Sequence, residues 1–274
     1  VESKTENDNW KAFYKKRITR VIIPYIIWTL LYSLPTVLRN GDILCVVKNL
    51  LTARAAATMY YIFVYIQFVL LTPLLGKLAK SKYRNLGWFV APLSTLIFKY
   101  YSLLSGVELN PYVSLFWGDC CLGWFTYYYL GLVLGNRIIE KNFSLKSLVA
   151  LYFVSMILQM AEGYGWLMLG ETNCGTQIKL TSFLTSTLFL LIIYTILKKP
   201  HVSVNSKFLR LLGDYSFGIY LCHIMVMMVF NQIPHYNVIP FPVNSVIIIL
   251  VSLACCCLAY RILGTKFSRR IGIK

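Results

Sequence analysis

The sequence predicts an all-α protein, a polytopic membrane helix bundle with eight transmembrane spans and both termini in the cytoplasm. This prediction depends on eight long apolar stretches and on the placement of basic residues between them. Hydrophobic residues form 58% of the chain and charged residues only 14%, a composition outside the range of soluble domains. We expect a single membrane domain over residues 1–274, because the spans leave no room for a soluble one.

Each apolar stretch is close to the ~20 residues that a helix needs to cross ~30 Å of hydrocarbon. In chain order the stretches are 18–34, 58–78, 86–101, 117–136, 144–160, 180–197, 211–233 and 243–263.

Basic residues set the expected orientation, because cytoplasmic loops of membrane proteins are enriched in Lys and Arg. With the N-terminus inside, 22 of the 27 Lys and Arg residues fall on the cytoplasmic side. The five that fall outside are Arg39, Lys48, Arg54, Lys99 and Lys179. The asymmetry predicts an even number of spans with both ends inside.

The formal charge of +17 does not indicate nucleic-acid binding, because the basic residues form short clusters beside the spans. Topology and anionic lipid headgroups explain such clusters. The eight cysteines are expected to be small helix-packing residues, since Cys222 and 255–257 lie inside spans. Palmitoylation or a metal site is the alternative for them, but no metal-ligand spacing is present, so we predict no metal.

The chain begins with VESKTENDNW, a polar segment that starts with Val1 and has no signal-peptide features. We therefore expect the membrane domain to be incomplete at its N-terminus.

Arg17 and Arg20 stand three residues apart at the mouth of the first stretch and share one helix face. Pro24 cannot donate a hydrogen bond to the carbonyl of Arg20, so the helix is expected to bend there with that acceptor free. Two guanidiniums beside a spare carbonyl suit phosphate groups. The alternative is that both are ordinary positive-inside anchors.

Ser216, Tyr220 and His223 form a polar stripe along one face of the seventh stretch. His223 lies about a dozen residues into the span at ~1.5 Å per residue, which places it near mid-bilayer. An ionisable residue at that depth is expected to face the bundle interior or a water-filled cavity. The alternative is a neutral packing histidine bonded to Tyr220 or to another helix.

Gln67 lies in the middle of the second stretch, six residues before Pro73. By default such an amide joins helices by hydrogen bonds, and it could also contact substrate.

Outer connections place Glu162 and Glu171 near Trp117 and Trp166, a combination that suits sugar rings or, alternatively, interfacial anchoring. Hydrolase, nucleotide-binding and zinc motifs such as GxSxG, the Walker loop and HExxH are absent.

Four segments in order resemble the acyltransferase-3 family of integral-membrane enzymes that O-acylate glycans. KKRITRVIIPYIIWTLLYSL resembles that family's third span, and MYYIFVYIQFVLLTPLLGKL its fourth. WFTYYYLGLVLGN resembles its aromatic-rich span, and YSFGIYLCH matches the family's signature near the C-terminus most closely. Together the four cover about residues 13–263.

The chain departs from the family in one respect. Members usually have ten spans, and the first holds an Arg and a His about ten residues apart. That element has no counterpart here, so the family's presumed catalytic histidine has no position in this sequence. The resemblance implies that Arg17 and Arg20 bind acyl-CoA and that His223 is a catalytic-core residue supporting the missing base or orienting Tyr220. Ser216, Tyr220 and Gln67 are the expected substrate contacts.

The expected function is transfer of an acyl group, acetyl in the first instance, from cytoplasmic acyl-CoA to a hydroxyl of a lipid-linked or exported polysaccharide. Acyl-CoA is then a co-substrate, with no resident cofactor, and membrane lipids are the other expected partners. We expect a multi-pass protein of the bacterial cytoplasmic membrane. The alternatives are a polysaccharide or glycolipid exporter, with Gln67 and His223 along its path, and a non-catalytic scaffold. An inverted repeat would favour the exporter, and none is evident.

Overall fold

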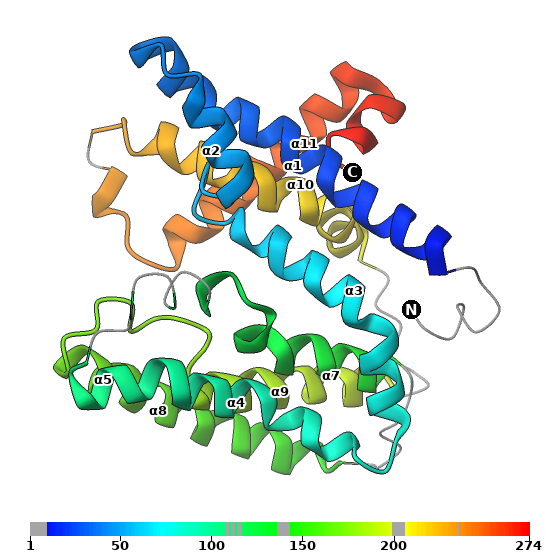
Figure 1. Ribbon diagram of the computed structural model, residues 1–274, viewed down its shortest axis with the longest axis vertical. Coiled ribbons are helices and arrows are strands. Elements are labelled where there is room, and N and C mark those ends of the chain that lie inside the picture. Colours follow the sequence, from blue (N-terminus) through cyan, green and yellow to red (C-terminus); the bar gives the residue numbers. More distant parts are fainter. Residues whose placement is uncertain are drawn as a thin grey trace. The chain divides into compact units, whose positions relative to one another are not determined.

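The computed structural model describes residues 10–107, 110, 113, 117–135, 143–198, 206–234 and 236–274, and their regular structure is helical (Figure 1). This confirms the all-α class. The α-helices are α1 (Trp10–Asn40), α2 (Leu44–Thr52), α3 (Tyr60–Lys80), α4 (Val90–Thr95), α5 (Tyr101–Ser105), α7 (Phe125–Gly135), α8 (Leu145–Met168), α9 (Leu180–Leu197), α10 (Lys207–Phe230) and α11 (Val243–Arg270). Shorter helical turns are η1 (Arg84–Trp88), η2 (Leu96–Tyr100), η3 (Cys121–Trp124) and η4 (Tyr236–Val238).

Within the described residues, six helices are long and apolar enough to cross a membrane: α1, α3, α8, α9, α10 and α11. The other two expected spans, 86–101 and 117–136, are built from shorter pieces. Over 86–101 the chain forms η1, α4 with Pro92 near its start, and then a π-helical turn, η2. Over 117–136 it forms η3 and the 11-residue α7. The sequence predicted the apolar character of both stretches but not these interruptions.

Local chemistry explains where several helices begin. Ser144 caps α8 by accepting a hydrogen bond from the backbone N–H of Ser147, and Ser206 caps α10 through the N–H of Leu209. Serine at this position satisfies one of the backbone donors that the first turn leaves unpaired. α11 begins directly after Pro242, a residue that lacks a backbone N–H.

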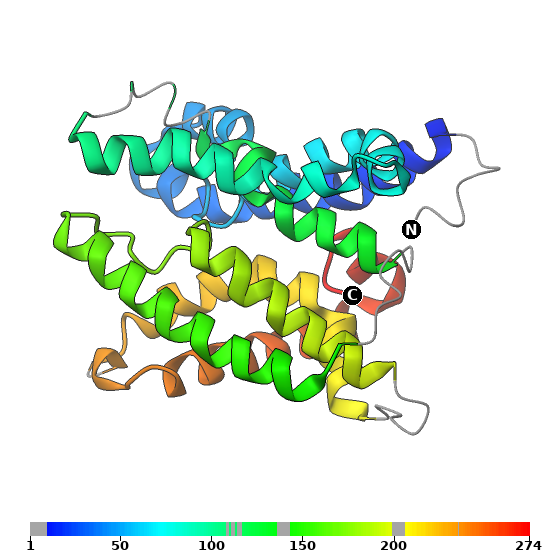
Figure 2. The same ribbon diagram turned by 90° about the horizontal axis from the view of Figure 1, so that it is seen from below.

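The chain divides into two compact units, and the boundary falls within α3. Gln67–Val204 forms the body of one, which we call the middle unit; Lys11–Ile66 and Asn205–Lys274 form the other, the flanking unit. In the middle unit α8 and α9 pack side by side (Figure 2). In the flanking unit α10 and α11 pack together, and the core includes Trp28, Tyr32 and Leu221.

The last four residues, Ile271–Lys274, which we call the tail segment, fold back into the flanking unit. Trp28 Nε1 donates to the carbonyl of Ile271 at 3.0 Å, and Ile271 and Ile273 are buried. Gly272 has a φ of +77°, a left-handed conformation that favours glycine. Lys274 Nζ lies over the rings of Tyr215 and Tyr260 at 5.3 and 4.7 Å. The tail segment is thus a structural part of the unit.

The contact between Gly218 of α10 and the tail segment leads to a stability prediction. A Cβ at Gly218 would lie 2.6 Å from the Ile273 carbonyl oxygen, and backbone cannot move aside as a side chain can. Gly218→Ala is therefore expected to lower the free energy of unfolding by about 1–3 kcal/mol, measured by thermal unfolding in detergent. Gly213→Ala is the control. Gly213 lies in the same helix, and a Cβ added there would meet no neighbouring atom within 4 Å. Equal melting temperatures for the two variants would show that the tail segment does not pack there.

Candidate functional site

A basic cavity of about 560 Å³ lies at the start of α1, within the flanking unit. Residues three and four apart in α1 share a face, and here that face turns toward the end of α11. Among the residues that the structure describes, no acidic residue lines the cavity, and its cationic side chains are exposed to solvent. The lining residues are Ala12, Lys15, Lys16, Thr19, Arg20, Ile23, Arg269 and Arg270. Three guanidiniums and two ammonium groups thus meet in one cavity, which suits a ligand with several anionic groups.

Arg269 and Arg270 reach this cavity because α11 changes direction before it ends. Gly264 has φ 74° and ψ 171°, which is not helical, and a further helical stretch leads to Arg270. The bond from Trp28 to the Ile271 carbonyl then ties the end of α11 to α1. From the sequence, Arg269 and Arg270 count only among the 22 basic residues expected on the cytoplasmic side. Gly264 and Gly272 were the available signs that the chain turns there.

The structure separates the two arginines that the sequence analysis paired. Arg20 lines the basic cavity, whereas the guanidinium carbon of Arg17 lies 5.7 Å from the centroid of the Phe13 ring, one turn earlier in α1. A cation over an aromatic ring is a stabilising contact within the helix. The helix continues through Pro24, which is buried.

His223 is half-buried in α10 and bonds to its own helix. Nδ1 lies 2.7 Å from the carbonyl oxygen of Tyr220 and 3.2 Å from that of Ile219. A carbonyl can only accept, so Nδ1 is the donor in these bonds, and in the neutral form of the ring the lone pair then lies on Nε2. This tautomer leaves Nε2 able to accept a proton.

The other two members of the polar stripe have different surroundings. The hydroxyl of Tyr220 donates to the carbonyl of Thr58, in the segment before α3. Ser216 is exposed, and its hydroxyl donates to Gly213 within the helix. The stripe therefore has one polar contact outside α10, from Tyr220 to the segment before α3.

A hydroxyl from α1 enters the backbone of α10 next to His223. Tyr32 Oη donates to the carbonyl of Leu221 at 2.7 Å and accepts from the N–H of Met225 at 3.1 Å. In a regular α-helix that carbonyl and that N–H are partners. Tyr32 thereby fixes the turn that bears His223. Sequence reasoning missed Tyr32, because nothing in its own helix marks it as different from the other aromatic residues of the span.

Gln67 uses both ends of its amide within the middle unit. Nε2 donates to the carbonyl of Asp119 at 2.7 Å, and Oε1 accepts from the N–H of Cys121 at 3.0 Å. These two bonds hold the backbone that leads into η3. The amide thus joins two segments, as it does by default between membrane helices.

Gln67→Leu is expected to lower the free energy of unfolding by about 2 kcal/mol or more, because it leaves a carbonyl and an N–H without their partner. Thermal unfolding in detergent measures the effect, with Leu74→Ala as the control because Leu74 is exposed on the same helix. An unchanged Tm with a raised KM for the acceptor would instead assign Gln67 to substrate binding.

A second polar cluster lies in the middle unit, where Glu162 and Glu171 meet the ends of the expected spans 86–101 and 180–197. Glu162 of α8 accepts hydrogen bonds from the N–H groups of Leu180 and Thr181 at 3.0 Å each, and also from Tyr100. Lys99 pairs with Glu171. Burial acts to raise the pKa of Glu171, but hydrogen bonds from Lys99 and the Asn173 N–H lower it overall.

A cavity of about 180 Å³ beside Lys99 and Glu171 is lined in part by Ser102 and Gly170. Trp166 is buried beneath Lys99, whose Nζ lies 5.7 Å from its ring centroid. All eight cysteines are free thiols, and in the part of the chain described here no three His, Cys, Asp or Glu residues are grouped so as to hold a metal ion.

Comparison with known proteins identifies the family to which the chain belongs. A family model described as an acyltransferase domain, of the acyltransferase-3 type, matches residues 3–261. No curated protein and no solved structure matches the chain. The family match spans nearly the whole chain, including the basic face of α1 and the stripe on α10. The chain is therefore an acyltransferase and belongs to the acyltransferase-3 family.

Proposed function

We propose that this acyltransferase moves an acyl group from cytoplasmic acyl-CoA to a hydroxyl of a lipid-linked or exported polysaccharide. The observation that carries the proposal is the basic cavity, where Arg20, Arg269 and Arg270 meet in a chain of this family. Coenzyme A bears several phosphate groups, and a guanidinium can bond a phosphate through two parallel N–H groups. Arg17, one turn from Arg20, adds positive charge beside the cavity. Acetyl is the acyl group we propose first.

The proposed reaction forms one bond and breaks one. The acceptor hydroxyl oxygen attacks the thioester carbonyl carbon, the C–S bond breaks, and coenzyme A leaves as a thiolate that takes up a proton. A base must accept the proton of the hydroxyl. We assign His223 to this proton transfer, because its Nδ1–H bond to Tyr220 leaves Nε2 available as an acceptor. Tyr220 and Ser216 are the proposed acceptor contacts beside it.

We also propose that both ends of the chain face the cytoplasm of a bacterial cell, with the cluster of Glu162, Glu171 and Trp166 on the opposite side, where a glycan can reach it. Single-cysteine reporters at Lys82 and Lys207 are then expected to react only from the cytoplasm, and reporters at Asp42 only from outside. The reason is the uneven distribution of Lys and Arg. Reaction of Asp42 and Lys82 from the same side would contradict this orientation.

The test of the proposed function follows label from acyl-CoA to glycan. Acyl-CoA with a labelled acyl group is added to membranes that contain the full-length protein. The acceptor is the lipid-linked glycan fraction of the cells that make the protein. We expect alkali-labile label on glycan, which His223→Ala abolishes. Movement of glycan across the membrane with no transfer of label would instead support the exporter.

A further inference from the structure

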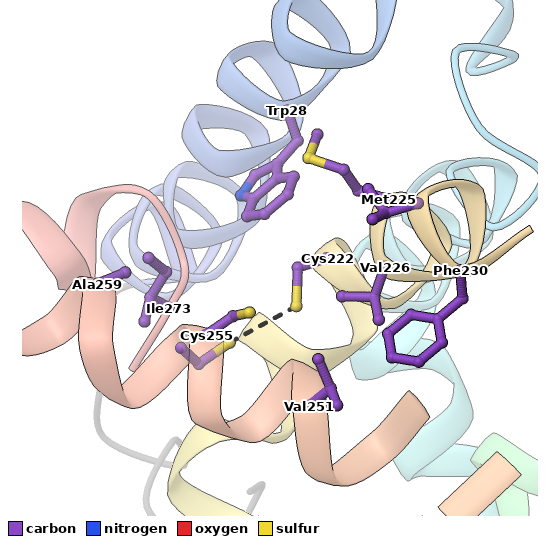
Figure 3. Close-up of a pocket in the computed structure, with 11 residues that line it drawn as sticks. Trp28, Cys222, Met225, Val226, Phe230, Val251, Cys255, Ala259 and Ile273 are labelled. Atoms are coloured by element: carbon purple, nitrogen blue, oxygen red, sulfur yellow. Dashed lines mark hydrogen bonds between the residues drawn. The ribbon is translucent and has the colours of Figure 1, made fainter. Parts of the chain in front are cut away.

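The flanking unit contains a second cavity, of about 340 Å³, formed by α1, α10, α11 and the tail segment (Figure 3). In Figure 3 the ring of Trp28, the side chain of Met225 and the ring of Phe230 surround one space, with Cys255 and Ile273 on other sides of it. All the lining side chains in the described part of the chain are apolar or sulfur-containing. The basic cavity lies elsewhere on α1 and α11 and has a different, cationic lining.

This cavity offers almost nothing to a polar ligand. Its one ring N–H, Nε1 of Trp28, already donates to the Ile271 carbonyl. The thiols of Cys222 and Cys256 lie 3.7 Å apart and bond to each other (dashed line in Figure 3). A ligand with hydroxyl or charged groups would lose its bonds to water on entry and gain none. The occupant must therefore be a hydrocarbon.

The volume suits a chain rather than a single small molecule. An engineered apolar cavity of about 150 Å³ is enough to bind benzene, with six carbon atoms. At that density a cavity of 340 Å³ has room for about a dozen carbon atoms. This corresponds to a large part of one lipid acyl chain.

The cavity reaches the surface of the unit where that surface is apolar. Of its lining residues, Trp28 and Cys222 are buried, whereas Val229 is 61% exposed. The same two helices, α10 and α11, carry further exposed apolar side chains, among them Met228 and Leu258. No charged residue occurs between Val243 and Tyr260 of α11, and α10 and α11 are both candidate membrane spans. In a membrane, the medium at the mouth of this cavity is lipid hydrocarbon.

We propose that this cavity binds one acyl chain of a membrane phospholipid, which enters from the bilayer at Val229 and ends against Trp28. The acyl chain makes van der Waals contacts that the lining side chains would lack if the cavity were empty. Because Ile273 forms part of the wall, the bound chain also supports the tail segment. Through the tail segment it supports the end of α11, where Arg269 and Arg270 lie.

Photo-crosslinking tests the proposal. The full-length protein is reconstituted in phosphatidylcholine vesicles that contain a phosphatidylcholine with a diazirine in mid-chain, and adducts are mapped by mass spectrometry. We expect adducts on Met225 and Val226, which line the cavity. Ala259→Phe places a phenyl ring in the cavity and is expected to reduce these adducts at least tenfold. Ile262→Phe is the matched control, because Ile262 is 72% exposed on the same helix, and it is expected to leave them unchanged.

Three results would overturn the proposal. One is labelling of Met225 and Val226 no stronger than that of Leu258, which is exposed on α11, and another is unchanged labelling in Ala259→Phe. The third is loss of the adducts on adding palmitoyl-CoA but not unlabelled phosphatidylcholine, which would assign the cavity to an acyl donor. If Ala259→Phe does not fold, Val251→Phe fills the cavity from another position. A rise in Tm when phosphatidylcholine is added to delipidated protein, smaller in the filled variant, is a second measure.

Discussion

Replacing Arg20 by alanine is expected to raise the KM for acyl-CoA roughly 10- to 100-fold, with the protein still folded and inserted. A hydrogen bond between charged partners contributes about 1.5–3 kcal/mol, and each 1.4 kcal/mol corresponds to a factor of ten. A similar rise in the KM for acyl-CoA is expected for the double variant Arg269→Ala and Arg270→Ala, because all three guanidiniums line one cavity. Arg20→Lys is expected to restore little, because an ammonium group cannot form two parallel bonds to a phosphate. Initial rates at varied acyl-CoA concentration measure the effect.

Two control variants separate the cavity from general surface charge. Arg261→Ala removes an exposed cation from α11 outside the cavity, and it is expected to leave the KM unchanged. Arg17→Ala is expected to have a smaller effect than Arg20→Ala, because Arg17 lies over Phe13. Equal effects of the Arg17 and Arg20 variants would indicate that these two arginines bind acyl-CoA together, as the sequence predicted, and not that the basic cavity binds it. Unchanged kinetics in the Arg20 variant would reduce these residues to topology anchors.

Replacing His223 by asparagine is expected to lower kcat by about 10²–10⁴-fold, the range that general acid–base groups contribute. The side-chain N–H of asparagine can take the place of Nδ1–H and donate to the Tyr220 carbonyl, so the local structure is retained. The group that asparagine lacks is Nε2. Transfer of labelled acyl groups in reconstituted vesicles, together with a thermal unfolding curve, measures activity and stability in the same preparation.

Comparing further variants shows whether His223 takes part in the reaction or only packs within α10. Met228→Ala, on the exposed surface of the same helix, is expected to be fully active. If His223→Asn keeps its activity whereas His223→Ala loses both activity and stability, His223 serves only to brace α10. Tyr32→Phe is expected to keep the fold but lower kcat, because the hydroxyl that holds the turn around His223 is lost.

The membrane character of the chain could be read from the sequence because it depends on local properties. Hydrophobicity over about 20 residues and the placement of Lys and Arg required no knowledge of packing. Each of the six long helices overlaps one of the stretches predicted in this way, although most of them extend beyond the predicted bounds. The interruptions at η2 and η3 were missed. The π-helical turn η2, between α4 and α5, does not change the hydrophobicity of the surrounding window, so hydrophobicity alone cannot detect it.

The candidate site was predicted only where it lies on one helix face. Arg20 on α1 and His223 with Tyr220 on α10 follow from helical periodicity alone. Their partners do not: Arg269 and Arg270 join Arg20 through a bond between residues 243 positions apart, and Tyr32 reaches α10 across 189 positions. The sequence by itself therefore determined a helical membrane protein and which residues share each face. The tertiary structure alone decided which faces meet, because such contacts depend on the packing of segments far apart in the chain and not on any local pattern.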